Sequence, residues 1–74
     1  MDTELWANMY EQKKATINGR NLWMYMIATA IGNLFVVEFE MQSKEIVRKI
    51  FDEDLEKADK YFKAACKMMI DGKI

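Results

Sequence analysis

Two dipeptides, Asn18-Gly19 and Gly32-Asn33, constrain the fold of this chain more than any other feature of its sequence. Asn-Gly suits a type I′ turn, in which both central residues need a positive φ, and Gly-Asn suits a type II′ turn, which needs glycine first. Each dipeptide joins segments rich in apolar residues, as in a β-hairpin. The chain is therefore predicted to form an antiparallel three-stranded meander with two-residue turns.

The turns set the register of the predicted strands, and the register decides which side chains share a face. Lys14 is expected opposite Trp23, Glu11 opposite Met26, and Val37 opposite Ala28. One face of the meander is then almost wholly apolar. The other combines aromatic and charged groups: Trp6, Tyr10, Lys14, Trp23, Tyr25 and Ile27, with Glu38 and Glu40.

From Ser43 the spacing of apolar residues changes from two to three or four, which is typical of an amphipathic helix. The residues that recur in this way are Val47, Phe51, Leu55, Ala58, Phe62, Ala65 and Met69. Ser43 is a suitable N-cap and Gly72 a suitable end. Asp54 falls on the apolar arc, and the acidic run 52–54 is itself a good helix start. A kink or break near residues 51–54 therefore stays open.

The sequence thus predicts an α+β fold, a three-stranded meander followed by a long C-terminal helix, continuous or broken. Segment 3–12 fits either a strand or a helix. With 74 residues, the chain is expected to form a single domain, 1–74.

Composition argues against most enzyme chemistry. The chain has no His and a single Cys, so no His–Cys or Ser–His pair can be built and no His-ligated metal site exists. We expect no enzyme activity, no cofactor and no metal. The lone Cys66 suits a reducing compartment, and Met1 to Arg20 contains no apolar signal region, so the expected location is the cytoplasm.

Apolar residues make up 51% of the chain, more than one contact between a sheet and a helix can bury. The excess falls in two places. The first is a second flank of the predicted helix, which we expect to form a homodimer: Ile46, Ile50, Tyr61 and Met68. The second is the aromatic sheet face, where Trp and Tyr are the usual anchors of a protein interface.

Other interpretations of the aromatic face stay open. The chain's own N-terminal segment or the end of its helix could cover the rings, or the rings could stack on a nucleotide-like ligand or single-stranded DNA. Glu38 and Glu40 weaken the nucleic-acid interpretation because carboxylates repel phosphate. A third class of function, a membrane miniprotein with one span at 21–37, rests on the absence of charge in that run.

The chain carries no motif that identifies a family. We therefore expect a small non-enzymatic protein-interaction module. Our specific hypothesis is an accessory protein of a phage or other mobile element that inhibits a host defence or regulatory complex by binding it. This hypothesis rests on size and composition alone, which is an analogy rather than a property of a site.

Overall fold

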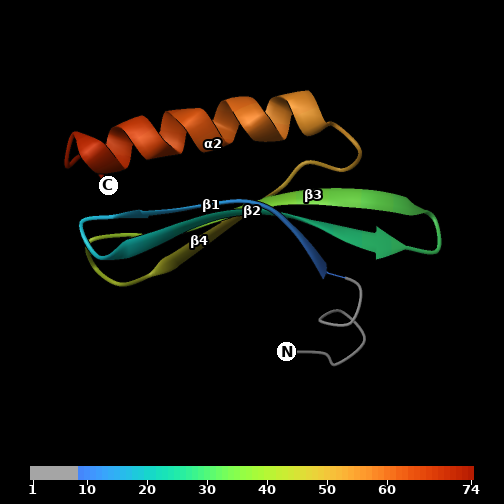
Figure 1. The fold of residues 1–74 in the computed structure, drawn as a ribbon, viewed down its shortest axis with the longest axis horizontal. Helices are drawn as coiled ribbons and strands as arrows, with labels where there is room; N and C mark the ends of the chain where they lie inside the picture. Colours follow the sequence, from blue (N-terminus) through green and yellow to red (C-terminus); the bar gives the residue numbers. More distant parts are fainter. Residues whose placement is uncertain (1–8) are drawn as a thin grey trace.

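A computed structural model describes residues 9–74, which form an antiparallel sheet of four strands followed by a helix (Figure 1). The sheet order is the chain order: β1 (Met9–Ile17), β2 (Arg20–Thr29), β3 (Gly32–Glu40) and β4 (Ile46–Ile50). The helix α2 (Leu55–Ile70) lies along one side of the sheet. The predicted α+β class is confirmed, with one strand more than the meander that the turns predicted.

The first hairpin turns at Asn18-Gly19, as predicted. The φ angles of the two residues are +51° and +78°, so both adopt the left-handed conformation that a type I′ turn requires. The register places Lys14 opposite Trp23, as expected. A two-residue turn of this type fixes the pairing of the strand ends that it joins.

Further from this turn, a bulge interrupts the pairing of β1 with β2. The register shifts between Glu11 and Lys13, so Glu11 lies opposite Tyr25 instead of Met26. An extra residue in one strand moves every residue beyond it to the other face. Tyr10 consequently pairs with Met26, on the side of the sheet that α2 covers. The prediction that placed Tyr10 on the aromatic face was wrong for this reason.

The second hairpin turns two residues earlier than predicted, at Ala30-Ile31 rather than at Gly32-Asn33. The Thr29 hydroxyl stabilises this turn, since it accepts from the N–H of Ile31 and donates to the carbonyl oxygen of Gly32. Gly32 is the first residue of β3. Its φ is +139°, and the Glu53 carboxylate occupies the space that a Cβ would need. Glycine is therefore required at position 32 because β3 starts there with a positive φ and no room for a Cβ. It is not required as a central residue of the turn.

The earlier turn moves each residue of β3 by four positions along β2. Val37 lies opposite Met24 rather than Ala28, and Phe39 lies opposite Leu22. Because four is an even number, no side chain changes face. The observed register has the advantage that large apolar side chains lie opposite one another on the helix side.

The run 21–37, considered above as a membrane span, forms most of β2 and the first part of β3. These strands pair with each other around the Ala30-Ile31 turn. Within residues 9–74, no helix has the length and apolar character needed to cross a membrane.

Residues 46–50 were predicted as helix and instead form β4. Four residues make two strand periods and also close to one helical turn, so the spacing of Val47 and Phe51 fits both structures. Both side chains pack against the core in the observed strand and the loop after it. The local composition favours the strand, because three of the five residues in β4 are β-branched.

The helix α2 begins after Asp54, whose side chain accepts a hydrogen bond of 3.0 Å from the N–H of Lys57. Residues 46–50 form a strand, so there is no helix that residues 51–54 could kink or break, and Ser43 is not the N-cap. Gly72, with a φ of +72°, ends the helix as predicted. The acidic run therefore starts the helix instead of interrupting it.

The main core lies between α2 and the sheet. Ala58 and Ala65 are 0% and 5% exposed, and their small side chains allow the helix to lie close to the strands. Larger residues fill the remaining space: Leu22, Met24, Val37, Phe39, Phe62 and Met69. At the rim, the Lys13 ammonium group contacts the Asp59 carboxylate and lies 5.6 Å from the centre of the Phe62 ring. This contact ties β1 to the helix.

Lys63 also binds Asp59, at 3.0 Å, one helical turn away. Hydrogen bonds from Lys13 and Lys63 lower the pKa of the Asp59 carboxyl below its ordinary value.

Candidate functional site

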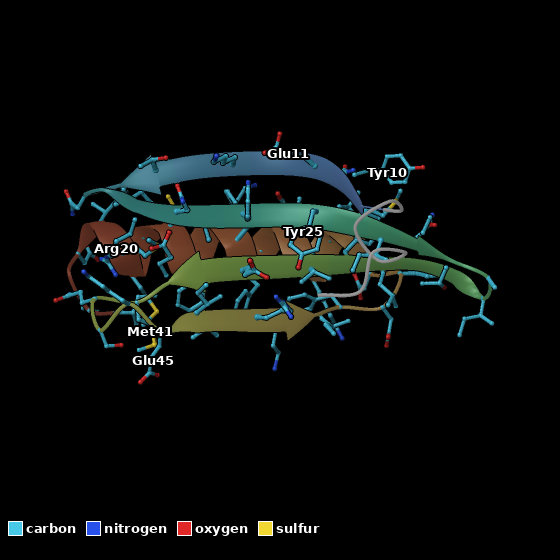
Figure 2. The ribbon with its side chains drawn as sticks, turned by 90° about the horizontal axis from the view of Figure 1, so that it is seen from below. Tyr10, Glu11, Arg20, Tyr25, Met41 and Glu45 are labelled. Carbon is cyan, nitrogen blue, oxygen red and sulfur yellow. The ribbon has the colours of Figure 1, made fainter. Side chains whose placement is uncertain are left out.

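The sheet has a second face, turned away from α2, which we call the far face (Figure 2). Cross-strand pairs share a face, so the register defines its members. Those used below are Glu11, Lys14, Asn21, Trp23, Tyr25, Ile27, Leu34, Val36, Glu38, Glu40, Ile46, Arg48 and Ile50. The predicted aromatic face, with Glu38 and Glu40, corresponds to the part of this surface on β1, β2 and β3, and β4 extends it.

The centre of the far face is a second apolar cluster. Tyr25, Ile27 and Val36 are 6%, 7% and 0% exposed, and Trp23 and Leu34 pack against them. Two of the predicted contact residues, Tyr25 and Ile27, therefore contribute to the interior of the fold. Trp23 is half-buried, and the solvent-accessible side chains of the far face lie around it.

The Glu38 carboxylate on β3 joins β2 and β4. Its Oε1 accepts a hydrogen bond of 3.0 Å from the Tyr25 hydroxyl and one of 2.7 Å from Nε of Arg48. Figure 2 places Tyr25 on β2 with its side chain directed toward β3. The Glu38 side chain is 14% exposed and that of Arg48 is 46% exposed, so the guanidinium remains accessible to solvent.

These contacts change the acid–base properties of two groups. Burial raises the pKa of the Tyr25 hydroxyl above its ordinary value, and the negative charge of Glu38 raises it further. The hydrogen bond with Glu38 raises the pKa of the Arg48 guanidinium. Tyr25 thus remains a neutral hydrogen-bond donor, and Arg48 remains a cation at this part of the surface.

Trp23 is held from β1 by two groups. Its indole N–H donates a hydrogen bond of 3.0 Å to Oε1 of Glu11, and the Lys14 ammonium lies 5.1 Å from the centre of a Trp23 ring. The second contact is within the range of a cation–π interaction. The bulge in β1 makes the first possible, because it turns Glu11 toward the far face.

The remaining predicted site residues are dispersed. Trp6 lies outside the described residues. Tyr10 lies beyond the bulge, on the face of the sheet that α2 covers, and is 52% exposed. Ile46 and Ile50 belong to β4 and not to a helix flank, and they are 63% and 55% exposed on the far face.

On α2, Tyr61 packs in the core, with its ring centre 5.2 Å from that of Phe51, whereas Met68 is 41% exposed. The predicted helix flank is therefore not one continuous surface.

Hollows on the described surface are open. One of about 60 Å³ lies on the far face between Trp23, Glu38, Glu40 and Ile46, well below the roughly 300 Å³ of a typical ligand pocket. A hollow of about 800 Å³ lies at the end of the sheet, between the Asn18-Gly19 turn, the segment joining β3 to β4 and Gly72. Residues 9–74 contain no group of three or more Cys, Asp and Glu side chains that could hold a metal ion.

Comparison of the chain with protein-family models, curated proteins and solved structures finds no match. The site therefore has to be interpreted from its own geometry.

Sequence reasoning missed Arg48 because it placed residues 46–50 on a helix, and it treated Glu38 only as a charge that repels phosphate. The density of β-branched residues in 46–50 was the signal for β4. A strand at this position pairs Arg48 with Glu38.

Proposed function

We propose that the chain is a non-enzymatic protein-binding module and that a partner protein binds the far face around Trp23 and Arg48. The observation that carries this proposal is the network of hydrogen bonds that holds these two side chains in place. Trp, Tyr and Arg are the residue types that contribute most to protein interfaces. Side chains already ordered in the free protein lose little entropy on binding, which favours affinity.

The charges on the far face favour a protein over a nucleic acid. Three carboxylates, on Glu11, Glu38 and Glu40, lie on the same face as Lys14 and Arg48. A surface that binds a phosphate backbone needs an excess of cations. Mixed charges around an aromatic side chain instead suit a protein surface with complementary groups.

A small nucleotide-like ligand or single-stranded DNA is the alternative that the aromatic side chains support. Stacking on Trp23 changes its fluorescence, so titration with nucleotides and oligonucleotides distinguishes the two classes. We expect no change in emission. Saturable quenching would favour the alternative.

For the biological setting, we keep the hypothesis formed from the sequence. We propose that the chain acts in the cytoplasm as an accessory protein of a phage or other mobile element. In this role it inhibits a host defence or regulatory complex by occupying one of its surfaces. The single thiol, half-buried Cys66, supports the cytoplasmic setting, because free thiols persist in a reducing compartment.

Affinity capture from an extract of the source cells tests the binding proposal. Lys14→Glu and Trp23→Ala alter the far face, and Lys57→Glu makes the same change of charge on an exposed position of α2. We expect one protein to be captured by the wild type and by Lys57→Glu, and to be lost with both far-face variants. Far-UV circular dichroism confirms that each variant is folded. Capture that is equal for all four baits, or absent for all, contradicts the proposal.

A further inference from the structure

The two edges of the sheet differ in how well they are protected against pairing with another strand. An edge strand exposes unpaired backbone groups, and bulges and lysines are common means of blocking them. The β1 edge has a bulge beside Lys13 and Lys14. The β4 edge has an unbroken register against β3 and carries two exposed isoleucines, Ile46 and Ile50. In Figure 2, β4 forms one border of the sheet, with Glu45 labelled near its start.

Backbone hydrogen bonds identify which groups of β4 point outward. At one end of the strand the N–H of Phe51 donates to the carbonyl oxygen of Phe35, at 2.7 Å, and at the other the carbonyl oxygen of Glu45 accepts from Met41, at 2.8 Å. Residues in an antiparallel strand alternate between its two neighbours. The odd-numbered residues therefore face β3, and the N–H and carbonyl groups of the even-numbered residues, 46, 48 and 50, face outward.

We propose that β4 pairs antiparallel with β4 of a second copy of this chain, with Val47 opposite Val47 at the two-fold axis. In this register Glu45 lies opposite Lys49 of the second copy, and the symmetry repeats the pair. Opposite charges at directly opposed positions stabilise a sheet. Ile46 lies opposite Arg48, whose aliphatic stem can cover it.

Neighbouring symmetric registers are less favourable. A two-fold axis at Arg48 opposes two guanidinium groups, and an axis at Lys49 opposes two ammonium groups, which destabilises the pairing. An axis at Ile46 requires Lys44 to pair opposite Arg48, but the φ of Lys44 is +71°, which is not an extended conformation. The charges of this strand therefore select the register centred on Val47.

The symmetry has two consequences for the assembly. A two-fold axis perpendicular to the sheet joins the two copies into one continuous sheet, with both helices on the same side. The two far faces then form one extended surface. Within residues 9–74 of each copy, the edges left free are the two β1 strands with their bulges. The assembly closes at two copies. Arg48 on β4 belongs to both this interface and the proposed partner site. The variants that test partner binding are at Lys14 and Trp23, on β1 and β2, so the two proposals can fail separately.

Charge reversal tests the register. The wild type is expected to sediment at twice the chain mass of 8.7 kDa. Lys49→Glu opposes Glu45 with a glutamate and Glu45→Lys opposes Lys49 with a lysine, so each variant should weaken the dimer about tenfold, equivalent to ~1.4 kcal/mol. The double variant Glu45→Lys/Lys49→Glu restores opposite charges and should restore the dimer. Lys57→Glu on α2 is the matched control and should leave it unchanged.

A mixture of the two single variants gives the sharpest result. One chain then has lysine at both positions and the other has glutamate, so the mixed dimer contains only attractive pairs. If one variant is labelled uniformly with ¹⁵N, the mixed dimer has a mass midway between those of the two homodimers, and native mass spectrometry should detect it predominantly. A wild type that remains a monomer, single variants that dimerise as well as Lys57→Glu, or a mixture without the mixed dimer would overturn the proposal.

Amide hydrogen exchange locates the interface independently. The amides of Ile46 and Arg48 point outward and pair with the second copy, so they should exchange slowly in the wild-type dimer and rapidly in Lys49→Glu. The amide of Val47 bonds to β3 and should remain slow in both. If the outward amides become protected only when another protein is added, the edge accepts a strand of that protein and the proposed dimer is wrong.

Discussion

Replacement of Glu38 by alanine should destabilise the fold, because this carboxylate is the shared acceptor of Tyr25 and Arg48. The Tyr25 residue is 6% exposed, so the loss of its acceptor leaves a nearly buried hydroxyl unpaired, which costs about 1–3 kcal/mol. The Arg48 side chain is 46% exposed, and an exposed ion pair of this kind contributes at most about 1 kcal/mol. We therefore expect Glu38→Ala to lower the free energy of unfolding by roughly 2 kcal/mol.

A double-mutant cycle separates the two contributions. Once Tyr25→Phe has removed the hydroxyl, Glu38→Ala should cost only the Arg48 part, so the two substitutions are coupled by about 1 kcal/mol or more. Urea denaturation followed by far-UV circular dichroism measures all four free energies, and Glu38→Gln, which keeps an acceptor, should cost less than Glu38→Ala. The reasoning is refuted if Glu38→Ala changes stability by less than about 0.5 kcal/mol, or if the costs of the two substitutions are additive.

The position of the helix start predicts that Asp54→Ala lowers the free energy of unfolding by about 1 kcal/mol. Ser43→Ala, in the segment before β4, should have no measurable effect in the same urea titration, and equal effects would contradict the observed start. Because two lysines lower the pKa of Asp59, its contribution to stability is present near neutral pH and is lost as the pH falls below about 5. When the free energy of unfolding is plotted against pH, Asp59→Asn should therefore make the slope on the acid side shallower. An unchanged slope would contradict this. Because burial and Glu38 raise the pKa of Tyr25, its contribution is complete below about pH 10 and is lost as the pH rises through the folded-state pKa. The difference in phenolate absorbance between wild type and Tyr25→Phe should have a midpoint above that of free tyrosine, and a midpoint at or below it would contradict the proposed environment.

The most reliable prediction from the sequence was the one based on the residues of the first turn. Asn18-Gly19 gave the first hairpin with its register because only residues that tolerate a positive φ fit a type I′ turn. Gly32 misled because glycine can also start a strand with a positive φ beside another side chain, here that of Glu53. The error was an even number of positions, so the residues of β2 and β3 kept their predicted faces.

The fourth strand and the bulge could not be derived from apolar spacing. The interval between Val47 and Phe51 suits a helix and a strand equally, and the choice depends on whether β3 offers an edge to pair with. The bulge near Glu11 depends on the pairing of two strands and leaves no periodic signal in either. The candidate site depends on both features, since they bring Arg48 and Glu11 to the far face.

A partner protein that binds the far face should cover Trp23. The chain has two tryptophans, so Trp6→Phe leaves Trp23 as its single tryptophan, and acrylamide quenching of the tryptophan emission reports the exposure of that side chain. On addition of the partner identified by capture, quenching of Trp23 should decrease markedly while the complex forms with wild-type affinity. A complex of the same affinity in which the quenching of Trp23 is unchanged would show that the partner does not cover the far face at Trp23.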